Sequence, residues 1–416
     1  MTIHTAHTIH MIGIKGVGMT ALAEVLHGWG KDVRGSDVEE VFMTDAVLAR
    51  RGIPVRAPFD AKNVQGADLI IYSTAYSDTN PEFAEAKKRG IPMHSYPEAL
   101  GQFLDGKYGI AVAGSHGKTT TTALLGHIMT EAGLDPTVIV GSVALNWNAN
   151  ARVGKSEYVV IEADEYQNKF QYYNPKGLLI TNIDWDHPDF FKTPEAYQKC
   201  FDDFRAKVVA ADGWVVETEK INYSPSPVEG LPLALSGDHN KKNLALVWAA
   251  AKKLGIKEDV FWPAVQSFRG TARRFEVKGE WHGVTVIDDY AHHPTEIQAT
   301  LKAARERFPG KKIWTVFHPH TFSRTAALLN EFAGSFADAD HVIVLDIYGS
   351  AREAHGGVHA RDLVQLIGAI ATYIPTIAEA AAHLRIHAKP GDVIITMGAG
   401  DVWRVGGTLL ASPEIM

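Results

Sequence analysis

The chain has almost no cysteine and no long apolar run. Cys200 is the single cysteine among 416 residues, which excludes an intramolecular disulfide and any metal site made of several cysteines. We expect it to be a buried structural thiol in a reducing compartment. No run reaches about 18 apolar residues, so no membrane span is predicted. The first residues lack a basic segment before an apolar core, so the cytoplasm is the expected location.

Positive charge is also scarce. Lysine and arginine total 41 against 48 aspartates and glutamates, which gives a net charge of −7. This balance argues against a broad nucleic-acid-binding surface, although it leaves room for a small basic pocket. Hydrophobic residues make up 46% and charged residues 21%, as in ordinary globular proteins. The length suggests about three domains.

Short apolar runs alternate with helical patterns along the whole chain, which predicts an α/β protein with parallel sheets. We expect a Rossmann-like unit over 1–105, a central P-loop ATPase-like unit over 106–269 and a second Rossmann-like unit over 270–416. The Pro/Gly/Ser-rich stretch 224–230 is predicted to be a loop. Strands are predicted at 9–14, 32–35, 68–72, 108–113, 178–182, 284–287, 313–317, 341–345 and 393–396, with one more ending at Glu162.

A glycine-rich segment at 114–119 resembles a phosphate loop, because it follows a strand and precedes a helical pattern. Its backbone N–H groups and the helix N-terminus would bind phosphate oxygens. Lys118 would reach the terminal phosphates and Thr119 would ligate Mg²⁺. The pattern is a variant, since Val112 stands where the first glycine is usual. The residues predicted to bind ATP here are Gly114, Ser115, His116, Gly117, Lys118, Thr119 and Thr120.

An earlier glycine loop has the order G-x-x-G-x-G rather than the dinucleotide-binding order, because Lys15 occupies the place of a glycine. Asp37 lies 19 residues beyond Gly18, near where a ribose-binding acid is expected. This loop either binds a nucleotide diphosphate or is a tight turn without a ligand. The residues predicted to bind at this sheet edge are Gly16, Val17, Gly18, Ser36, Asp37, Ser73 and Thr74.

Acidic and histidine side chains follow two strands of the central unit. Glu162, with Asp164 and Glu165 beside it, comes at a strand's carboxyl end and is a candidate Mg²⁺ ligand. His187 follows the next strand and would ligate a second Mg²⁺ or orient a reacting carboxylate. The alternatives are a helix cap for the acidic cluster and an ordinary loop histidine at 187.

Two strand ends of the third unit present D-D-Y-A-H-H-P at 288–294 and H-P-H-T-F-S-R-T at 318–325. Zinc is not favoured, because no H-E-x-x-H motif or cysteine pair is present. Recognition of a small zwitterion fits better, since Arg324 could pair with a carboxylate in a bidentate way. Arg273 and Arg274 begin this unit and either meet phosphates or form a solvated linker pair.

Together these motifs resemble the Mur ligases of peptidoglycan synthesis. The matching residues include G-S-H-G-K-T-T-T-T, E-A-D-E, T-N-I-x-x-D-H, G-D-H-N at 237–240, R-R-F-E at 273–276 and the two motifs of the third unit. The match extends through nearly the whole chain. The last two motifs are the specific ones, whereas the phosphate loop alone indicates only the superfamily.

The resemblance implies an ATP-dependent ligase that joins L-alanine to the carboxylate of UDP-N-acetylmuramate through an acyl phosphate. ATP and Mg²⁺ would be required. Lys118, Glu162 and His187 would carry the catalysis, and Thr119, Glu162 and His187 would hold metal. The remaining implied contacts are Asn240, Asn243, Arg273 and Asp288 for ATP, and Tyr290, His292, His320 and Arg324 for the amino acid.

Several positions depart from the family pattern, and rival functions stay open. Thr321 replaces a second arginine, so Arg324 would hold the alanine carboxylate without it. In the first unit, Lys15 replaces a glycine, Pro58–Phe59 stands where Gly-His is common, and Ser95–Tyr96 stands where an arginine is usual. The resemblance therefore leaves the details of uridine diphosphate binding open. A ligase that adds a tripeptide, glycine or serine is the nearest alternative, and a non-catalytic nucleotide-dependent sensor is a more distant one. Neither a nucleic acid nor a membrane is an expected partner, and we expect a monomer or weak homodimer.

Overall fold

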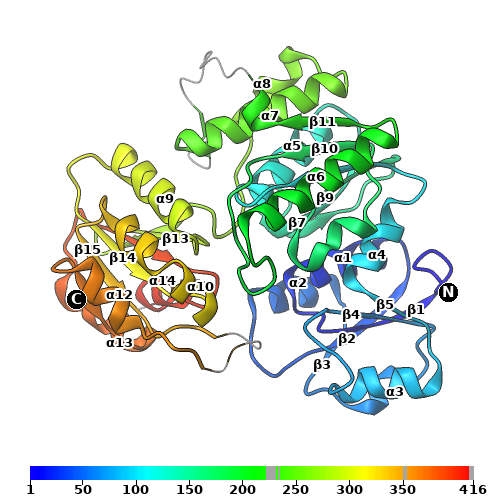
Figure 1. Ribbon diagram of the computed structural model, residues 1–416, viewed down its shortest axis with the longest axis horizontal. Coiled ribbons are helices and arrows are strands. Elements are labelled where there is room, and N and C mark those ends of the chain that lie inside the picture. Colours follow the sequence, from blue (N-terminus) through cyan, green and yellow to red (C-terminus); the bar gives the residue numbers. More distant parts are fainter. Residues whose placement is uncertain (222–230, 233–234, 350–352, 354, 412–416) are drawn as a thin grey trace. The chain divides into compact units, whose positions relative to one another are not determined.

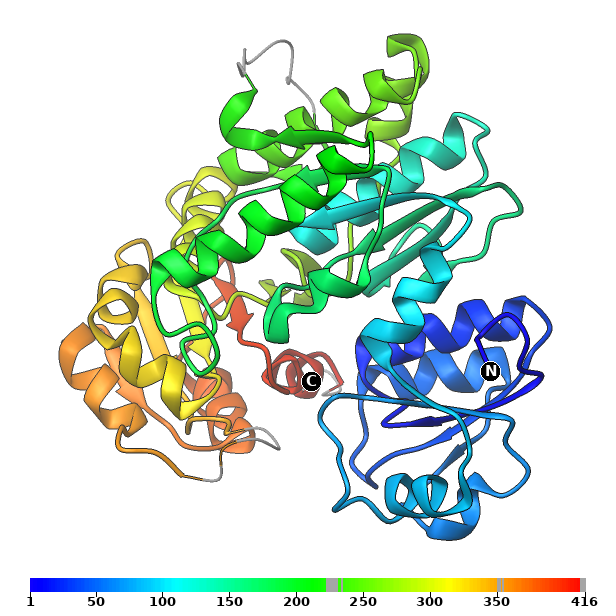
Figure 2. The ribbon, with the colours of Figure 1, turned by 45° about the vertical axis from the view of Figure 1, so that its right-hand side comes forward.

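The protein contains three β-sheets distributed over two compact units. The computed structural model describes residues 1–221, 231–232, 235–349, 353 and 355–411, so the predicted loop at 224–230 lies outside the described residues. The first unit comprises 1–185, 194–226 and 243–269, and the second comprises 186–193, 227–242 and 270–416. Figure 1 labels the helices and strands, and Figure 2 shows the same ribbon from a second direction. The three sheets confirm the predicted three-domain α/β architecture.

The first sheet is wholly parallel, with the strand order β3-β2-β1-β4-β5. Its central strand β1 is buried along most of its length, as expected of a parallel strand covered on both faces. Because β2 and β4 flank β1, the loop after β1 lies where the connections leave in opposite directions. The elements are β1 Thr8–Ile12, α1 Val17–Gly28, β2 Asp32–Ser36, α2 Met43–Arg51, β3 Val55–Arg56, β4 Leu69–Tyr72, α3 Pro81–Arg89, β5 Met93–Ser95 and α4 Tyr96–Leu104.

The second sheet belongs to the same compact unit and has the order β11-β10-β6-β9-β7-β8. Strand β6 lies between β10 and β9, and all pairings are parallel except that of β7 with β8. The elements are β6 Tyr108–Ala113, α5 Lys118–Glu131, β7 Thr137–Ala144, β8 Ala149–Arg152, β9 Tyr158–Glu162, β10 Gly177–Ile180, α6 Pro194–Ala210, β11 Trp214–Glu217, α7 Asp238–Lys253 and α8 Glu258–Gln266.

A buried carboxylate joins these two sheets. Glu24 on α1 accepts N–H groups from Asn150 (2.9 Å) and Ala151 (3.0 Å) of β8, and it pairs with Arg51. Burial raises the pKa of Glu24, and these donors partly offset that cost. Helix α1 packs on the β7–β8 hairpin, so the first two sheets form one body.

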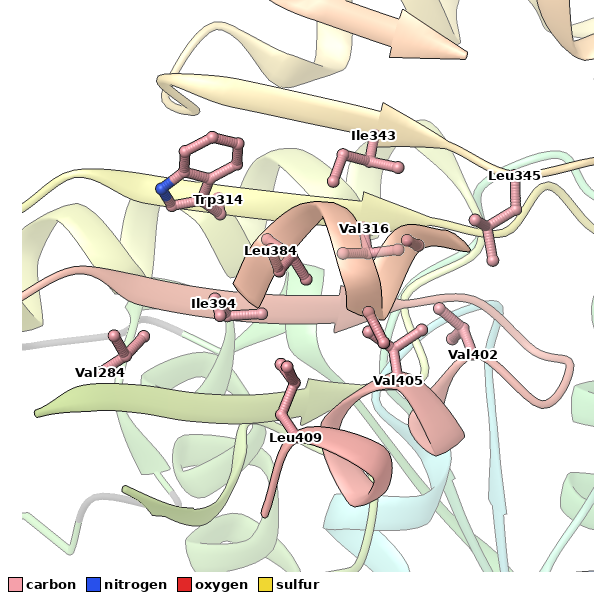
Figure 3. Close-up of a cluster of buried hydrophobic side chains, with 12 residues drawn as sticks. Val284, Trp314, Val316, Ile343, Leu345, Leu384, Ile394, Val402, Val405 and Leu409 are labelled. Carbon is pink, nitrogen blue, oxygen red and sulfur yellow. The ribbon is translucent and has the colours of Figure 1, made fainter. Parts of the chain in front are cut away.

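The third sheet has the order β12-β13-β17-β14-β15-β16, with β12 antiparallel and the rest parallel. Figure 3 shows the core on one of its faces, where Leu384 of α13 and Val405 and Leu409 of α14 lie over Ile394 and Val316. The elements are β12 Glu276–Trp281, β13 Val284–Asp289, α9 Pro294–Arg307, β14 Ile313–Phe317, α10 Phe322–Ala327, α11 Leu329–Ala333, β15 His341–Val344, α12 Ala360–Ile367, β16 Ala371–Tyr373, α13 Ile377–His387, β17 Val393–Met397 and α14 Trp403–Leu410.

Several sequence expectations can be compared with this fold. The strands predicted at 108–113 and 313–317 are confirmed residue for residue, and the other predicted strands shift by a few positions. The antiparallel edge strands β8 and β12 were not predicted. Cys200 is buried, as expected. Within the described part of the chain, no helix has the length and apolarity needed to cross a membrane.

Candidate active site

The phosphate-loop segment lies between β6 and α5, as the sequence predicts. Gly114 has φ +131° and Gly117 has φ +80°, which are conformations that favour glycine. A Cβ atom would also clash at both places, against the Thr181 hydroxyl at position 114 and at 2.8 Å from the Asn243 amide at position 117. Glycine is therefore required here both by conformation and by space.

Lys118 begins α5 and its ammonium group turns back toward the loop. It donates to the carbonyl of Gly114, to that of Ser115 at 3.1 Å and to Glu165 Oε2 at 3.2 Å. Burial opposes the charged form, but Glu165, Asp164 and Glu162 raise the pKa of Lys118 overall. The group is thus held cationic beside the loop backbone, where a phosphate chain would lie.

Two of the predicted magnesium ligands are neighbours. The Thr119 hydroxyl donates to Glu162 Oε1 at 2.9 Å, and the Gly141 N–H of β7 donates to the other carboxylate oxygen at 2.7 Å. A hydroxyl beside a carboxylate is an oxygen donor set that suits Mg²⁺. The chemistry of these two residues therefore fits the ion that the family resemblance implies.

A buried carboxylate, Glu165, also supports the loop. Glu165 is 1% exposed and accepts a hydrogen bond from the Tyr197 hydroxyl at 2.9 Å. The Tyr197 hydroxyl also lies 2.8 Å from Ser115 Oγ, which in turn donates to the Asp184 carbonyl. His116 lies 3.1 Å from Asp184 Oδ2. The predicted loop residues Ser115 and His116 are therefore held by neighbouring side chains, and their contact with ATP stays a prediction.

The first glycine loop is built differently. Its lysine is 5% exposed, and Lys15 Nζ donates to the carbonyls of Val38 (3.0 Å) and Glu40 (2.8 Å) and pairs with Asp45. The Lys15 N–H donates to Asp37 Oδ2 at 2.7 Å. Lys15 thus ties the loop to the segment after β2 rather than offering a free cation.

The acid predicted to bind a ribose is also turned into the protein. Asp37 is 4% exposed and its other oxygen accepts from the Val38 N–H and from the Tyr76 hydroxyl at 3.2 Å. Ser36 is fully buried and donates to Glu82. Gly16, Gly18, Ser73 and Thr74 lie at the same carboxyl edge, and Val17 is 40% exposed. The side chains of Ser36 and Asp37 thus hold the edge together, and their contact with a UDP-sugar stays a prediction.

In the second unit, Arg273 is buried and fully engaged. Its guanidinium donates to Asp288 Oδ2 at 3.0 Å and to the carbonyls of Gly398 (2.6 Å) and Gly400 (2.9 Å). The other Asp288 oxygen accepts from the Thr396 hydroxyl at 2.7 Å. Burial raises the pKa of Asp288, although Arg273 opposes the shift. In the structure this pair connects β13 to the loop after β17. Its contacts with ATP stay a prediction.

The neighbouring arginine is the more accessible of the two. Arg274 lies 5.1 Å from the centroid of the Tyr290 ring and 3.8 Å from Glu296, and its side chain is one-quarter exposed. The sequence singled out the R-R pair without distinguishing its members. Of the two arginines, Arg274 is therefore the better candidate to bind an anionic ligand.

The four residues predicted to hold the amino acid are adjacent within the second unit. The rings of Tyr290 and His292 lie 5.2 Å apart, those of His292 and His320 lie 6.3 Å apart, and His320 Nδ1 is 3.3 Å from Arg324. His292 also lies 3.2 Å from the Glu296 carboxylate. The cluster supplies aromatic surface, imidazoles and one guanidinium, which suits a small zwitterion.

Arg324 forms an ion pair with the carboxylate of Asp186. Its Nε lies 3.0 Å from Oδ1 and its Nη2 lies 3.2 Å from Oδ2, in a bidentate pair. Burial favours the neutral acid, but Arg324, His187 and His292 hold the pKa of Asp186 well below its usual range. The sequence reasoning missed Asp186, although it directly precedes the His187 that was singled out.

The remaining predicted residues are placed as follows. His187 belongs to the second unit, has φ +56° and donates its backbone N–H to Asp186 at 2.6 Å. Asn240 is buried on α7 and bonds the Ser236 carbonyl at 3.0 Å, and Asn243 is buried near Gly117. Thr120 is buried in α5. The functions of these residues stay predictions.

Three family models match successive parts of the chain. They are described as Mur ligase family, catalytic domain (8–108), Mur ligase middle domain (112–223), and Mur ligase, glutamate ligase domain (273–400). Two relatives, the UDP-N-acetylmuramate–L-alanine ligases of Desulfitobacterium hafniense (strain Y51) and Agathobacter rectalis, are 40% and 38% identical to this chain. Each alignment covers 97% of this chain, with 99% and 97% of the relatives.

Solved structures agree with these matches. The UDP-N-acetylmuramate-alanine ligase of Thermotoga maritima is 28% identical, with a TM-score of 0.83 over 97% of this chain and 98% of that one. A murein peptide ligase from Psychrobacter arcticus 273-4 shares the fold, with a TM-score of 0.70 at 24% identity and coverage of 97% and 98%. The chain belongs to the Mur ligase family.

Proposed function

We propose that this protein joins L-alanine to the muramyl carboxylate of UDP-N-acetylmuramate, with conversion of ATP to ADP and phosphate. The observation that carries the proposal is the near-complete match to relatives named for this reaction, at 40% identity over 97% of the chain. The adjacent Lys118, Thr119 and Glu162 support it, because they provide the cation and oxygen donors that an ATP site needs. The enzyme would act in the cytoplasm, as a monomer or weak homodimer.

The reaction requires activation because a carboxylate does not lose hydroxide readily. A carboxylate oxygen attacks the γ-phosphorus, the bond to the β-phosphate oxygen breaks, and ADP leaves. The alanine amine, as the free base, attacks the acyl carbon, and phosphate departs from the tetrahedral intermediate while the nitrogen loses a proton. A bound Mg²⁺ would neutralise charge on the phosphates.

The residues on this chain divide that work. Lys118 would hold the β- and γ-phosphates in place of its pairing with Glu165, and Thr119 and Glu162 would hold Mg²⁺. The backbone N–H groups of Gly114–Gly117 cradle the phosphate chain. His187 would ligate a second Mg²⁺ or contact the reacting carboxylate. Asn240, Asn243, Arg273 and Asp288 would serve the nucleotide, the last two through the structure that they hold together.

The amino acid would lie among Tyr290, His292, His320 and Arg324. Arg324 shows that it can take a carboxylate in a bidentate pair, because it does so with Asp186. L-Alanine would share or replace that partner. On the other side of the reaction, the UDP-sugar would lie along Gly16–Gly18, Ser36–Asp37 and Ser73–Thr74, at the carboxyl edge of the first sheet.

The deciding experiment measures phosphate release from ATP and the ligated product by mass spectrometry. The protein is given UDP-N-acetylmuramate with L-alanine, glycine, L-serine or a muropeptide tripeptide in separate reactions. We expect release that depends on both UDP-N-acetylmuramate and L-alanine, with the highest kcat/KM for L-alanine. Release that requires the tripeptide, or that ignores L-alanine, would overturn the proposal. Nucleotide binding without turnover would instead indicate a sensor.

A further inference from the structure

The ring of Tyr96 lies on the first glycine loop. Tyr96 is the first residue of α4, and a Cβ atom built on Gly18 would lie 2.7 Å from its hydroxyl and 2.8 Å from the ring carbon that carries it. Gly18 has an ordinary helical position in α1, so no positive φ calls for glycine there. Space for the Tyr96 phenol is therefore the physical reason for glycine at position 18.

The same phenol is electrostatically close to the acidic cluster of the second sheet. Burial raises the pKa of Tyr96 well above its usual value, and the Glu162 and Asp164 carboxylates raise it further. Glu162 also accepts the Thr119 hydroxyl of the phosphate loop. Tyr96 therefore contacts the first glycine loop at Gly18 and also feels the charge of Glu162, which bonds to the second loop.

The Tyr96 hydroxyl has not been used in the fold. Across the described ranges, no hydrogen bond joins it to another residue, and the side chain is partly exposed. Other phenols in this unit are engaged: Tyr197 donates to Glu165 at 2.9 Å and Tyr76 donates to Asp37 at 3.2 Å. Tyr96 therefore presents a neutral donor to whatever lies between the two loops.

We propose that the Tyr96 hydroxyl binds the UDP-sugar substrate, donating a hydrogen bond to an anionic oxygen between its diphosphate and its reacting carboxylate. This inference rests on the proposed function, because it takes UDP-N-acetylmuramate as the ligand. In the proposed complex, the substrate would bring its anionic oxygens into a region where Glu162 and Asp164 already contribute negative charge. A protonated phenol attracts an anionic oxygen without adding another formal charge, and the same carboxylates keep it protonated.

The test is Tyr96→Phe, which removes one oxygen and leaves the ring on Gly18. Equilibrium binding of UDP-N-acetylmuramate is measured by calorimetry, and KM and kcat are measured for each substrate. We expect affinity for the UDP-sugar to fall about tenfold or more, since hydrogen bonds to charged groups are the stronger ones. The affinity for ATP should stay unchanged. The matched control is Tyr158→Phe, at the opposite end of β9 from Glu162, which should match the wild type.

The kinetic pattern locates the contact. A rise in KM for the UDP-sugar with unchanged kcat supports a contact to the diphosphate or sugar, and a fall in kcat supports one to the reacting carboxylate. Unchanged binding and kinetics, or a change confined to ATP, would overturn the proposal. Calorimetry needs no turnover, so a wild-type protein that binds the UDP-sugar but does not ligate L-alanine would count against the proposed function alone.

A second variant guards against a simple packing effect. Gly18→Ala would place a methyl group against the Tyr96 hydroxyl and so displace it. It should weaken UDP-sugar binding, and adding Tyr96→Phe to it should cost little more, because the two changes remove the same contact. Fully additive losses in this cycle would overturn the direct hydrogen bond. Thermal unfolding of each variant verifies that the fold persists.

Discussion

The two glycine loops of the first compact unit carry the same ingredients but use them in opposite ways. Each follows a strand that has parallel neighbours on both sides and leads into a helix, and each has a lysine with a threonine close by in the chain. In the first loop, Lys15 is buried on two carbonyls and Asp45. In the second, Lys118 lies at the helix start on a buried carboxylate and two loop carbonyls.

The threonine of each loop differs in the same way as its lysine. The Thr20 hydroxyl donates to the Ile14 carbonyl of its own loop at 2.8 Å, whereas the Thr119 hydroxyl reaches across to Glu162 of another strand. In the first loop, the side chains of Lys15 and Thr20 therefore stabilise the loop and the segment beside it. The second loop directs its lysine and threonine toward Glu162, the last residue of β9, and Glu165, which follows that strand. We therefore propose that the surroundings of a lysine in a glycine loop, more than its spacing, distinguish a phosphate-binding lysine from a structural one.

The largest expected effect comes from Lys118→Met. Loss of the cation that faces the β- and γ-phosphates should lower kcat by about a thousandfold, the scale of removing one preorganised electrostatic contact. Phosphate release under saturating substrates measures it, and far-UV circular dichroism shows that the fold is kept. Turnover within tenfold of the wild type would remove the functional difference between the loops.

Lys15→Met is the matched change in the first loop and should act on stability. It leaves the carbonyls of Val38 and Glu40 and the Asp45 carboxylate without their donor, at a cost of about 2 kcal/mol. Urea unfolding measures this, and kcat should stay within about twofold. Lys87→Met, which breaks an exposed pair with Asp78, is the control and should change stability little. A collapse of kcat in Lys15→Met would mean that both loops bind reacting phosphates.

Thr119→Val and Thr20→Val form a second matched pair. Removing the Thr119 hydroxyl deletes one oxygen donor beside Glu162, so the Mg²⁺ concentration for half-maximal activity should rise about tenfold. Thr20→Val should leave the Mg²⁺ requirement unchanged and cost about 1 kcal/mol of stability, the scale of one buried hydrogen bond. Equal Mg²⁺ titrations for the two variants would contradict the difference drawn between the loops.

Buried strands and edge strands differ in how well the sequence predicts them. Buried parallel strands such as β6 and β14 are continuous apolar runs, so their limits were read correctly. The edge strands β8 and β12 were missed because they mix polar and apolar residues, and β12 is largely solvent-facing. Their position depends on pairing with β7 and β13, which no local pattern encodes.

The site shows a similar limit. Lys118 and Thr119 were identified because strand, loop and helix are contiguous in the chain. Tyr96 and Asp186 were not singled out, because each contacts a residue far away in the sequence, Gly18 and Arg324 respectively. Arg273 and Arg274 are adjacent, and only the fold shows that the first is buried on Asp288.

The smallest expected effect concerns the pH dependence of the first loop. Burial raises the pKa of Asp37 above 3.8, despite the opposing N–H groups of Val38 and Lys15 and the Tyr76 hydroxyl. The folded chain therefore keeps this proton at pH values where the unfolded chain has lost it. The contribution of Asp37 to stability is greatest below pH 3.8 and declines as pH rises through the folded-state pKa.

Comparing the wild type with Asp37→Asn isolates the contribution of Asp37 to the free energy of unfolding. In urea unfolding across pH 3 to 7, the wild type should lose stability relative to the variant as pH rises, by about 1.4 kcal/mol for each unit of pKa shift. A wild type that gains relative stability as pH rises would mean that the first loop stabilises a carboxylate better than water does. The loop would then be a preformed anion site like the second one, and the two loops would differ less than their side chains indicate.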